Sequence, residues 1–473
     1  MSASDRIPLI ESKDRFSSVF AAAVTASLAS LCFGFTLGYT SPTELKMTTD
    51  GKDGHLVISK NQFSWFASLI AIGALFGSML AGYFIDKFGR KSTIIMTSLL
   101  YMPGWCLISY ASNVLMLYSG RILTGIAVGM SSLSVPVYIA EIASPRLRGG
   151  LGAINQLGVV VGIFIAYLVG AFLTWQWTAM FANFIVVAMV LLMLLMPETP
   201  RWLLAHGQRQ LGLQGLQWLR GPLYDAEAEI CDIENNLDKQ EKASFRDFMT
   251  PGLYRPLIIG SMLMMFQQFC GINAVLFFDA KIFKSAGIDG ADKVSLLVGG
   301  AQVLSTVVSC LIVDKLGRRL LLMVGSISMF LCTLLLGIYY DIAKIDNDEN
   351  TISIFGKISH TVPLHQISWL AALCVIVYII VFSIGWGPLP WLLMSEIFPP
   401  RARGFASGIV TFVNWLLVFV VTKFFHNMIV SFHEQGTFWF FSAFSLASFF
   451  FVFFCVPETK GKSLEDIEQL FAL

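Results

Sequence analysis

The stretch DKFGRK occupies residues 86–91, and a near copy of it, DKLGRR, occupies residues 314–319. A second pair follows in the same order, because EIASPRLRG at 141–149 matches EIFPPRARG at 396–404. The second pair keeps its glutamate, one proline and both arginines at identical spacing. Two motif pairs in one order indicate that the chain contains an internal duplication.

The segments between these motifs are long and apolar. Of 473 residues, 56% are hydrophobic and only 13% are charged, whereas soluble domains have about 25% charged residues. A helix crosses a bilayer with about 20 mainly apolar residues, and the alternating pattern of barrel strands is absent. The sequence therefore predicts twelve membrane-spanning helices, near residues 17–38, 62–82, 93–112, 116–139, 151–172, 176–196, 257–280, 292–313, 320–340, 368–394, 405–428 and 435–456.

A third motif pair, PETPRWL from Pro197 and PETKGKSL from Pro457, closes each half. The copies of each motif fall in loops on the same side of the membrane, so each half has an even number of spans, which gives six plus six. Such repeats are related by an axis along the membrane normal, with the substrate site expected between them. We therefore predict an all-α integral membrane protein of two six-helix bundles with pseudo-two-fold symmetry. Its predicted segments are a tail at 1–16, a bundle at 17–196, a helical linker at 197–256, a bundle at 257–456 and a tail at 457–473.

Basic residues predict which side of the membrane each loop faces. They lie in alternate loops, at Arg90, Lys91, Arg146, Arg148, Arg201, Arg209, Arg318, Arg319, Arg401, Arg403, Lys460 and Lys462. By the positive-inside tendency these loops, and with them both termini, face the cytosol. The eight cysteines form no CxxC or Cys/His cluster, so neither a metal site nor a cofactor is predicted.

The segment MMFQQFCGINAVLFF, residues 264–278, carries polar amides inside a predicted span. An unpaired amide in hydrocarbon costs several kcal/mol, so such side chains usually face a bundle interior or a wet cavity. Gln267 and Asn273 would point to different faces of a straight helix, but a break at Gly271 would turn Asn273 toward the same cavity. Amides donate and accept hydrogen bonds, which suits a neutral polyhydroxy ligand. The alternative is that Gln267, Gln268 and Asn273 only link neighbouring helices.

The complete motif set resembles the sugar porter family of the major facilitator superfamily. The likeness runs from about residue 20 to residue 467 and rests on DKFGRK, GRILTGIAVG, PVYIAEIASPRLRG, NQLGVVVG, PETPRWL, QQFCGINA, DKLGRR, GWGPLPWLLMSEIFP and VPETKGKSLEDIE. Within the family the chain is most similar to the class III facilitative glucose transporters, by GWGPLPWLLMSEIFP and by a long polar loop at 341–368. That class usually carries its glycosylation site in this loop, but no Asn-x-Ser/Thr sequence occurs there.

The resemblance implies the major facilitator fold and a set of sugar-contacting residues. It places Gln156, Gln267, Gln268, Asn273 and Trp391 at sugar-binding positions, with Trp415 beside them. An indole face packs against the C–H face of a pyranose while its N–H remains a donor. Further candidates within the spans are Gln302, Gly387 and Asn414, and Gln302 departs from the asparagine that is common in plasma-membrane relatives.

The repeated loop motifs predict a cytosolic gate. Charged residues of the first half are mirrored in the second, which gives the set Asp86, Arg90, Glu141, Arg148, Glu198, Asp314, Arg318, Arg319, Glu396, Arg403 and Glu458. One surface ion pair is worth little, but a network that separates when two bundles rock apart can bias a two-state equilibrium. We expect the network to favour the outward-open state, and Arg121 to pair with a gate group or with span one. The alternative is that the basic residues only set the topology.

The predicted activity is facilitative uniport of a neutral hexose, with glucose as the first choice. Proton-coupled members of the family carry an acid in the first span, and in FGFTLGY the matching position is Thr36. Proton-coupled symport and transport of trehalose or another disaccharide are the alternatives, and a sugar sensor is a further one. No nucleophile, base and orienting acid converge in the spans, so the chain is not predicted to be an enzyme.

The N-terminal tail contains DRIPLI, residues 5–10. Asp5, Leu9 and Ile10 fit the acidic dileucine pattern that clathrin adaptors recognise, and class III relatives carry similar signals. Besides the sugar and the lipid bilayer, an adaptor is therefore an expected partner. The predicted location is an endosomal, lysosomal or other intracellular membrane, with the plasma membrane as the alternative. Patterns as short as this one also occur by chance.

Overall fold

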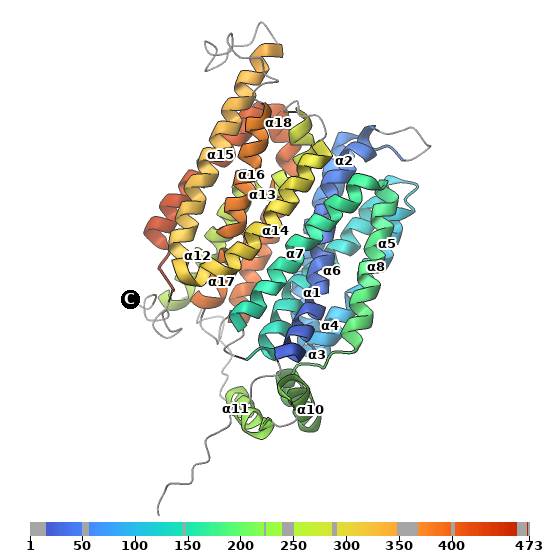
Figure 1. Cartoon of the computed structure of the whole chain (residues 1–473), viewed down its shortest axis with the longest axis vertical. Coiled ribbons are helices and arrows are strands. Elements are labelled where there is room, and N and C mark those ends of the chain that lie inside the picture. The colour runs from blue at the N-terminus through green and yellow to red at the C-terminus, as the bar shows by residue number, and fades with distance from the viewer. Residues whose placement is uncertain are drawn as a thin grey trace, which may run out of the picture.

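The computed structural model describes residues 16–49, 56–144, 148–221, 224–238, 250–285, 291–347, 368–398, 403–460 and 471. All regular secondary structure in these ranges is helical. Two helical bundles stand side by side, and α10 and α11 lie beyond one end of them (Figure 1). We name the end of the bundles that carries these helices the linker end, and the opposite end the far end.

The first half contains eight helices and the linker contains three. The helices of the first half are α1 (Phe16–Gly38), α2 (Thr40–Thr49), α3 (Lys60–Phe88), α4 (Arg90–Met96), α5 (Ser98–Ser109), α6 (Val114–Ile142), α7 (Arg148–Phe172) and α8 (Trp175–Leu194). The linker helices are α9 (Pro200–Ala205), α10 (Arg209–Arg220) and α11 (Ala226–Asp238).

The second half contains the remaining seven helices of the described ranges. They are α12 (Pro251–Phe269), α13 (Ile272–Ser285), α14 (Ala291–Leu316), α15 (Arg318–Asn347), α16 (Ser368–Ile384), α17 (Leu389–Ile397) and α18 (Arg403–Cys455). Helix α12 begins at Pro251, earlier than the predicted residue 257, because a proline is favourable in the first helical turn. Helix α15 continues past the predicted residue 340 to Asn347.

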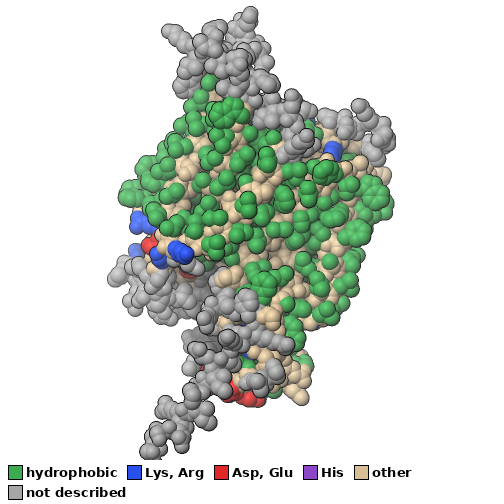
Figure 2. All heavy atoms as spheres, viewed as in Figure 1, with side chains coloured by type: hydrophobic (Ala, Val, Ile, Leu, Met, Phe, Trp, Pro, Cys, Tyr) green, Lys and Arg blue, Asp and Glu red, His purple; other side chains and the backbone are tan. Residues whose placement is uncertain are grey.

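Twelve membrane spans follow from these helices. Within the described ranges, 11 helical stretches are long and apolar enough to cross a bilayer, and the longest, Gly404–Cys455, has 52 residues. One crossing needs about 20 residues. His433 interrupts the long stretch with φ 57° and ψ 178°, so α18 comprises two spans. The predicted fold of twelve spans in two bundles is confirmed. Figure 2 shows hydrophobic side chains covering the visible side of the bundles.

Helices α3 and α6 pack backbone against backbone in the first half. A Cβ atom at Gly77 would overlap the carbonyl of Ile126, and one at Gly129 would overlap the carbonyl of Ala74. Close approach at small residues is the usual way in which membrane helices associate, since lipid removes the hydrophobic driving force between them. The glycines of GRILTGIAVG therefore hold α6 against α3.

The two halves touch each other from mid-depth to the far end. Helix α3 packs against α18, α7 against α14, and α2 against α13. The Tyr167 hydroxyl donates to the carbonyl of Leu276 at 2.7 Å, and the rings of Phe63 and Phe278 lie 6.3 Å apart. In the described ranges, each ion pair joins two residues of the same half or of the linker. The contacts that join the halves therefore close the far end.

Candidate functional site

The seventh span is broken at Gly271, as its sequence predicts. Helix α12 ends at Phe269 and α13 begins at Ile272, and Gly271 between them has φ +93°. This backbone conformation is readily available to glycine but costly for other residues. A Cβ atom at Gly271 would also lie 2.6 Å from the ring of Phe441. Backbone strain and steric overlap therefore both require glycine at the break.

Four amide side chains form one hydrogen-bonded cluster around the break. Asn273 Nδ2 donates to Gln268 Oε1 across the break. Gln268 Nε2 donates to Asn414 Oδ1 of α18 at 2.7 Å and to Gln267 Oε1 at 3.3 Å. All four side chains are buried, with at most 8% of their surface exposed. We call Gln267, Gln268, Asn273 and Asn414 the amide cluster.

The cluster is tied to a second break, between α16 and α17. Gln267 Nε2 donates to the carbonyl of Trp386 at 2.7 Å and to that of Gly387 at 3.2 Å. Regular helical hydrogen bonds are interrupted between Ile384 and Leu389, so these carbonyls accept from a side chain. The Trp386 indole N–H in turn donates to the carbonyl of Leu322, at 3.0 Å. The predicted residue Gly387 thus supports the site through its backbone.

Each of two further residues that were predicted to contact sugar has a buried polar atom without a hydrogen-bond partner among the described residues. Gln302 on α14 is 4% exposed and Trp415 on α18 is 3% exposed. Gln302 Oε1 and Trp415 Nε1 have no hydrogen-bond partner among the described residues. A buried polar atom without a partner costs about 1–3 kcal/mol. The pair leaves one acceptor and one donor available to a ligand.

The other predicted sugar contacts lie apart from the amide cluster's hydrogen bonds. Gln156 on α7 and Trp391 on α17 are half-buried, and in the described structure no hydrogen bond joins either of them to the cluster. Trp415 reaches the first half, because its ring centroid lies 5.9 Å from that of Phe33 on α1. Sequence reasoning missed Asn155, which accepts a hydrogen bond from Ser30 Oγ at 2.6 Å.

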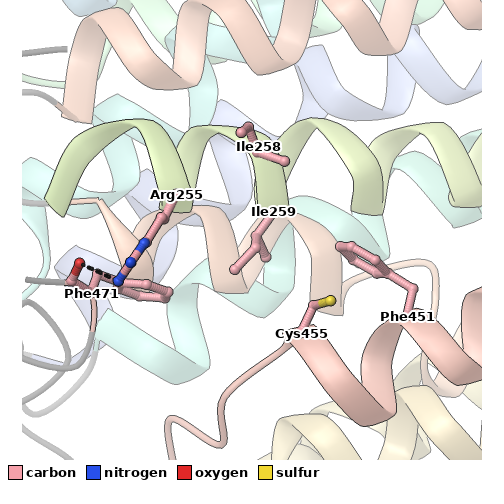
Figure 3. Close-up of a pocket in the computed structure, with 6 residues that line it drawn as sticks. All are labelled: Arg255, Ile258, Ile259, Phe451, Cys455 and Phe471. Carbon is pink, nitrogen blue, oxygen red and sulfur yellow. Dashed lines mark hydrogen bonds between the residues drawn. The ribbon is translucent and has the colours of Figure 1, made fainter. Parts of the chain in front are cut away.

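A separate hollow of about 300 Å³ lies between the start of α12 and the end of α18. Figure 3 shows Arg255 and Phe471 on one side of it and Phe451 and Cys455 on the other. Arg255 Nη1 donates to the carbonyl of Phe471 at 3.4 Å. The remaining lining side chains are apolar, so this hollow lacks the donors and acceptors that a sugar needs.

At the linker end, the first and third motifs of the first half combine into one structure. Gly89 has φ +93°, and a Cβ atom there would overlap the carboxylate of Glu198. That carboxylate accepts hydrogen bonds from the backbone N–H groups of Arg90 and Lys91, both at 3.1 Å. Backbone N–H groups at the start of a helix lack acceptors within the helix, and here the carboxylate accepts their hydrogen bonds. We call this arrangement the first clasp.

The second half repeats the arrangement, which we call the second clasp. Gly317 has φ +91°, and its Cβ atom would lie 2.7 Å from Glu458 Oε2. The Glu458 carboxylate accepts from the N–H groups of Arg318 at 3.0 Å and Arg319 at 3.1 Å. The Thr459 hydroxyl adds a 2.6 Å hydrogen bond to Glu396 Oε2. In the first half, Thr199 Oγ1 is buried without a partner among the described residues.

The two clasp carboxyls differ in pKa. Burial raises the pKa of Glu198, and the backbone N–H groups that it accepts from do not offset this. Burial also acts to raise the pKa of Glu458, but its four backbone N–H donors outweigh the effect and lower the pKa. The two copies of the motif therefore place equivalent carboxyl groups in different electrostatic surroundings.

The predicted gate residues form ion pairs within each half. Arg90 Nη2 lies 2.8 Å from Glu141 Oε1, and Arg90 Nη1 lies 4.0 Å from Asp86 Oδ1. Arg318 Nη2 lies 3.0 Å from Glu396 Oε1. The side chains of Arg148, Asp314 and Arg403 lie outside the described part of the structure. These pairs, which join described residues only, fix each loop, and none of them crosses between the halves.

Arg121 lies with span one and apart from these ion pairs, one of the two placements that its sequence left open. Its guanidinium donates to the Thr36 carbonyl at 2.9 Å and to Thr40 Oγ1 at 2.5 Å. Its Cζ lies 4.4 Å from the ring centroid of Phe66. Among the described residues, no carboxylate is within ion-pair distance of this buried arginine.

Two basic residues escaped sequence reasoning. Arg220 of α10 is buried, and its Nη1 donates to the carbonyl of Ile142 at the end of α6, at 3.0 Å. Lys423 lies within α18 and contacts α3 of the other half. The signal for Lys423 was present in the sequence, since it is a cation inside a predicted span.

Comparison with known proteins agrees with this arrangement. The family described as "Sugar (and other) transporter" matches residues 22–471. The bovine protein named "Solute carrier family 2, facilitated glucose transporter member 8" is 39% identical over 457 residues, which cover 96% of this chain and 94% of the relative. The Bombyx mori protein named "Facilitated trehalose transporter Tret1" is 38% identical over 95% of this chain and 86% of its own.

Solved structures with the same fold include the xylose transporter XylE from E. coli. Its partially occluded inward-open form has a TM-score of 0.77 at 25% identity, over 94% of this chain and 100% of that one. The form described as a proton:xylose symporter bound to 6-bromo-6-deoxy-D-glucose has a TM-score of 0.75 at 26% identity, over 96% of this chain and 99% of that one. The chain thus belongs to the sugar porter family of the major facilitator superfamily and is a multi-pass membrane transporter of sugar.

Proposed function

We propose that the protein carries a neutral hexose, with glucose as the first candidate, by facilitative uniport and alternating access. The amide cluster is the observation that carries this proposal. Its groups are uncharged, and amides both donate and accept, as each sugar hydroxyl does. Gln302 Oε1 would add an acceptor from α14, and Trp415 Nε1 would add a donor from α18. A charged substrate would call for a carboxylate or a guanidinium in this place.

The amide cluster alone does not separate hexoses from trehalose, which is also a neutral polyhydroxy compound. Relatives of similar identity are named glucose transporter and trehalose transporter. We place glucose first because GWGPLPWLLMSEIFP, residues 385–399, resembles the corresponding motif of the class III facilitative glucose transporters.

Uniport is supported by the surroundings of Arg121. Coupling to protons requires a titratable group within reach of the cavity, usually a carboxylate inside the membrane. The family position for such an acid holds Thr36, whose hydroxyl donates to the carbonyl of Cys32 at 2.7 Å. Arg121 is held by neutral oxygens of Thr36 and Thr40. Proton symport remains the second candidate, because the XylE structures belong to a proton:xylose symporter.

Uptake by the purified full-length protein in proteoliposomes tests the proposal. A panel of radiolabelled glucose, fructose, galactose and trehalose is offered with and without an inward proton gradient. We expect glucose to equilibrate across the membrane at the same final level in both conditions. Accumulation above equilibrium under the gradient would establish symport, and uptake of trehalose without glucose would establish a disaccharide carrier.

We further propose that the linker end faces the cytosol and that its ion pairs act as a gate. The positive-inside tendency supports this side, since the basic motifs lie at that end. The structure is then closed on the outer side, in keeping with the likeness to the inward-open XylE form. When the linker end closes, Arg90 and Arg318 would exchange partners across the halves and stabilise the outward-open state.

The acidic dileucine pattern supports a location in endosomes or lysosomes. Asp5, Leu9 and Ile10 lie outside the described residues, so this proposal depends on the sequence. Replacing Leu9 and Ile10 by alanine should move a fluorescently tagged protein toward the plasma membrane, as measured by surface biotinylation. An unchanged distribution would make the motif incidental.

A further inference from the structure

A lysine side chain lies on the far-end contact between the two halves. Lys423 belongs to α18 and sits inside the apolar stretch Gly404–Cys455. Its Nζ is 4.1 Å from the ring centroid of Trp65 and 3.3 Å from Asn61 Oδ1, and both partners lie on α3 of the first half. The carbonyl of Lys423 accepts a hydrogen bond from Ser64 Oγ at 2.9 Å. One residue of the second half thus meets three residues of the first.

The partners of this cation are neutral. An amide oxygen and the face of an indole hold the ammonium, and no carboxylate of the described residues lies within ion-pair distance of it. A cation in a membrane span is costly, and it usually marks a functional position. Trp65 is 39% exposed, and at such partly exposed sites a cation–π contact changes an equilibrium constant by about 2- to 5-fold.

The contact can exist only while α3 and α18 lie together. The neighbouring rings of Trp65 and Phe419, with centroids 6.3 Å apart, join the same two helices. An opening of the far end that separates α3 from α18 would break these contacts. An interaction made in only one of two states shifts the equilibrium toward that state.

We propose that Lys423 and Trp65, assisted by Asn61, form a latch that holds the far end closed and sets the balance between the two open states. Lysine suits a latch that must release. Its ammonium lies over the indole face in the closed state and regains water when the far end opens. A purely apolar contact would instead expose hydrophobic surface at each opening. Lys423 is therefore a gating residue at the end opposite the charged motifs.

The distance between the halves at the far end tests the latch. Nitroxide labels are attached to cysteines placed at Val57, in the first half, and Phe432, in the second, which are 47% and 57% exposed. The exposed native cysteines Cys106, Cys231, Cys310 and Cys455 are replaced by serine, and the four buried ones stay. Pulsed electron paramagnetic resonance on full-length protein in liposomes, without sugar, then gives the populations of the short and long distances.

We expect Lys423→Met to raise the ratio of long to short distances by about 2- to 5-fold. Lys423→Arg should restore the original ratio, because a guanidinium also stacks on an indole face. Trp65→Leu should shift the ratio in the same direction as Lys423→Met. The double variant should shift it by less than the two single effects combined, since either substitution alone already removes the contact that the two residues share. A merely structural role would not give this pattern of rescue and non-additivity.

A matched control lies within one helix at the linker end. Lys87 Nζ is 5.2 Å from the ring centroid of Tyr83, and both residues belong to α3. Lys87→Met removes the same kind of contact without touching the interface between the halves, so the ratio should stay unchanged. Populations unaltered in both Lys423→Met and Trp65→Leu would overturn the latch. Because no sugar is added, the result does not depend on which substrate is carried.

Discussion

At the scale of single residues, the amide cluster separates side chains that support the site from side chains that are free to bind. Gln268 forms hydrogen bonds with Asn273, Gln267 and Asn414. Gln302 Oε1 accepts no hydrogen bond from a described residue. Both side chains are buried amides, with 3% and 4% of their surface exposed. Their removal should therefore have different consequences for folding.

We predict that Gln268→Leu weakens sugar affinity and also lowers thermal stability. The leucine leaves Asn273 Nδ2 and Asn414 Oδ1 without a partner, at about 1–3 kcal/mol for each buried group. Gln302 Oε1 accepts no hydrogen bond from a described residue, so Gln302→Leu should cause little loss of stability. It should weaken sugar affinity by about 5- to 10-fold, the worth of one hydrogen bond to the ligand. Competition binding of the transported sugar and thermal unfolding in detergent measure the two effects. Unchanged affinity in Gln302→Leu would remove that residue from the site.

At the scale of helices, the sequence was most informative where a glycine or a short polar segment interrupts an apolar run. Gly271 predicts the break between α12 and α13, and the break is present. The interruption of α18 at His433 also falls between two predicted spans. By contrast, no glycine or proline marks the join of α4 and α5, where the Thr97 hydroxyl donates to the carbonyl of Ile94 at 2.6 Å. Such local competition by a threonine is common and has no distinct sequence pattern.

Contacts between distant motifs could not be predicted from the sequence. The repeats named Gly89 and Glu198 as members of two separate motifs, but only the fold brings the carboxylate onto the start of α4. In the proposed gate, the partners of Arg90 and Arg318 change with the end of the molecule that is closed, and one sequence encodes both states. Lys423 needed its partner helix α3 before its contact with Trp65 could be seen. Residue types could thus be predicted, while partners required the structure.

At the scale of the whole molecule, the stability of the two clasps depends on pH in opposite directions. The lowered pKa of Glu458 means that the second clasp is stabilised by ionisation above the ordinary value of 4.5, and that this contribution is lost as the pH falls below 4.5. The raised pKa of Glu198 has the opposite sign. Its neutral form is favoured in the fold, so the first clasp gains stability as the pH falls toward 4.5 from above.

We therefore predict that isosteric neutralisation affects the halves unequally. Glu458→Gln removes charge-assisted acceptance from Arg318 and Arg319 N–H, and should lower the local opening free energy by about 1.5–3 kcal/mol. Glu198→Gln mimics the form that burial favours and should cost under about 1 kcal/mol. Hydrogen exchange of the amides at 90–91 and 318–319 measures both values.

If the loops present the gate arginines, Glu458→Gln should also slow sugar uptake in liposomes, with Glu198→Gln as its matched control. Equal loss in both halves would contradict the asymmetry, and weakened protection with unchanged uptake would remove the second clasp from the gate.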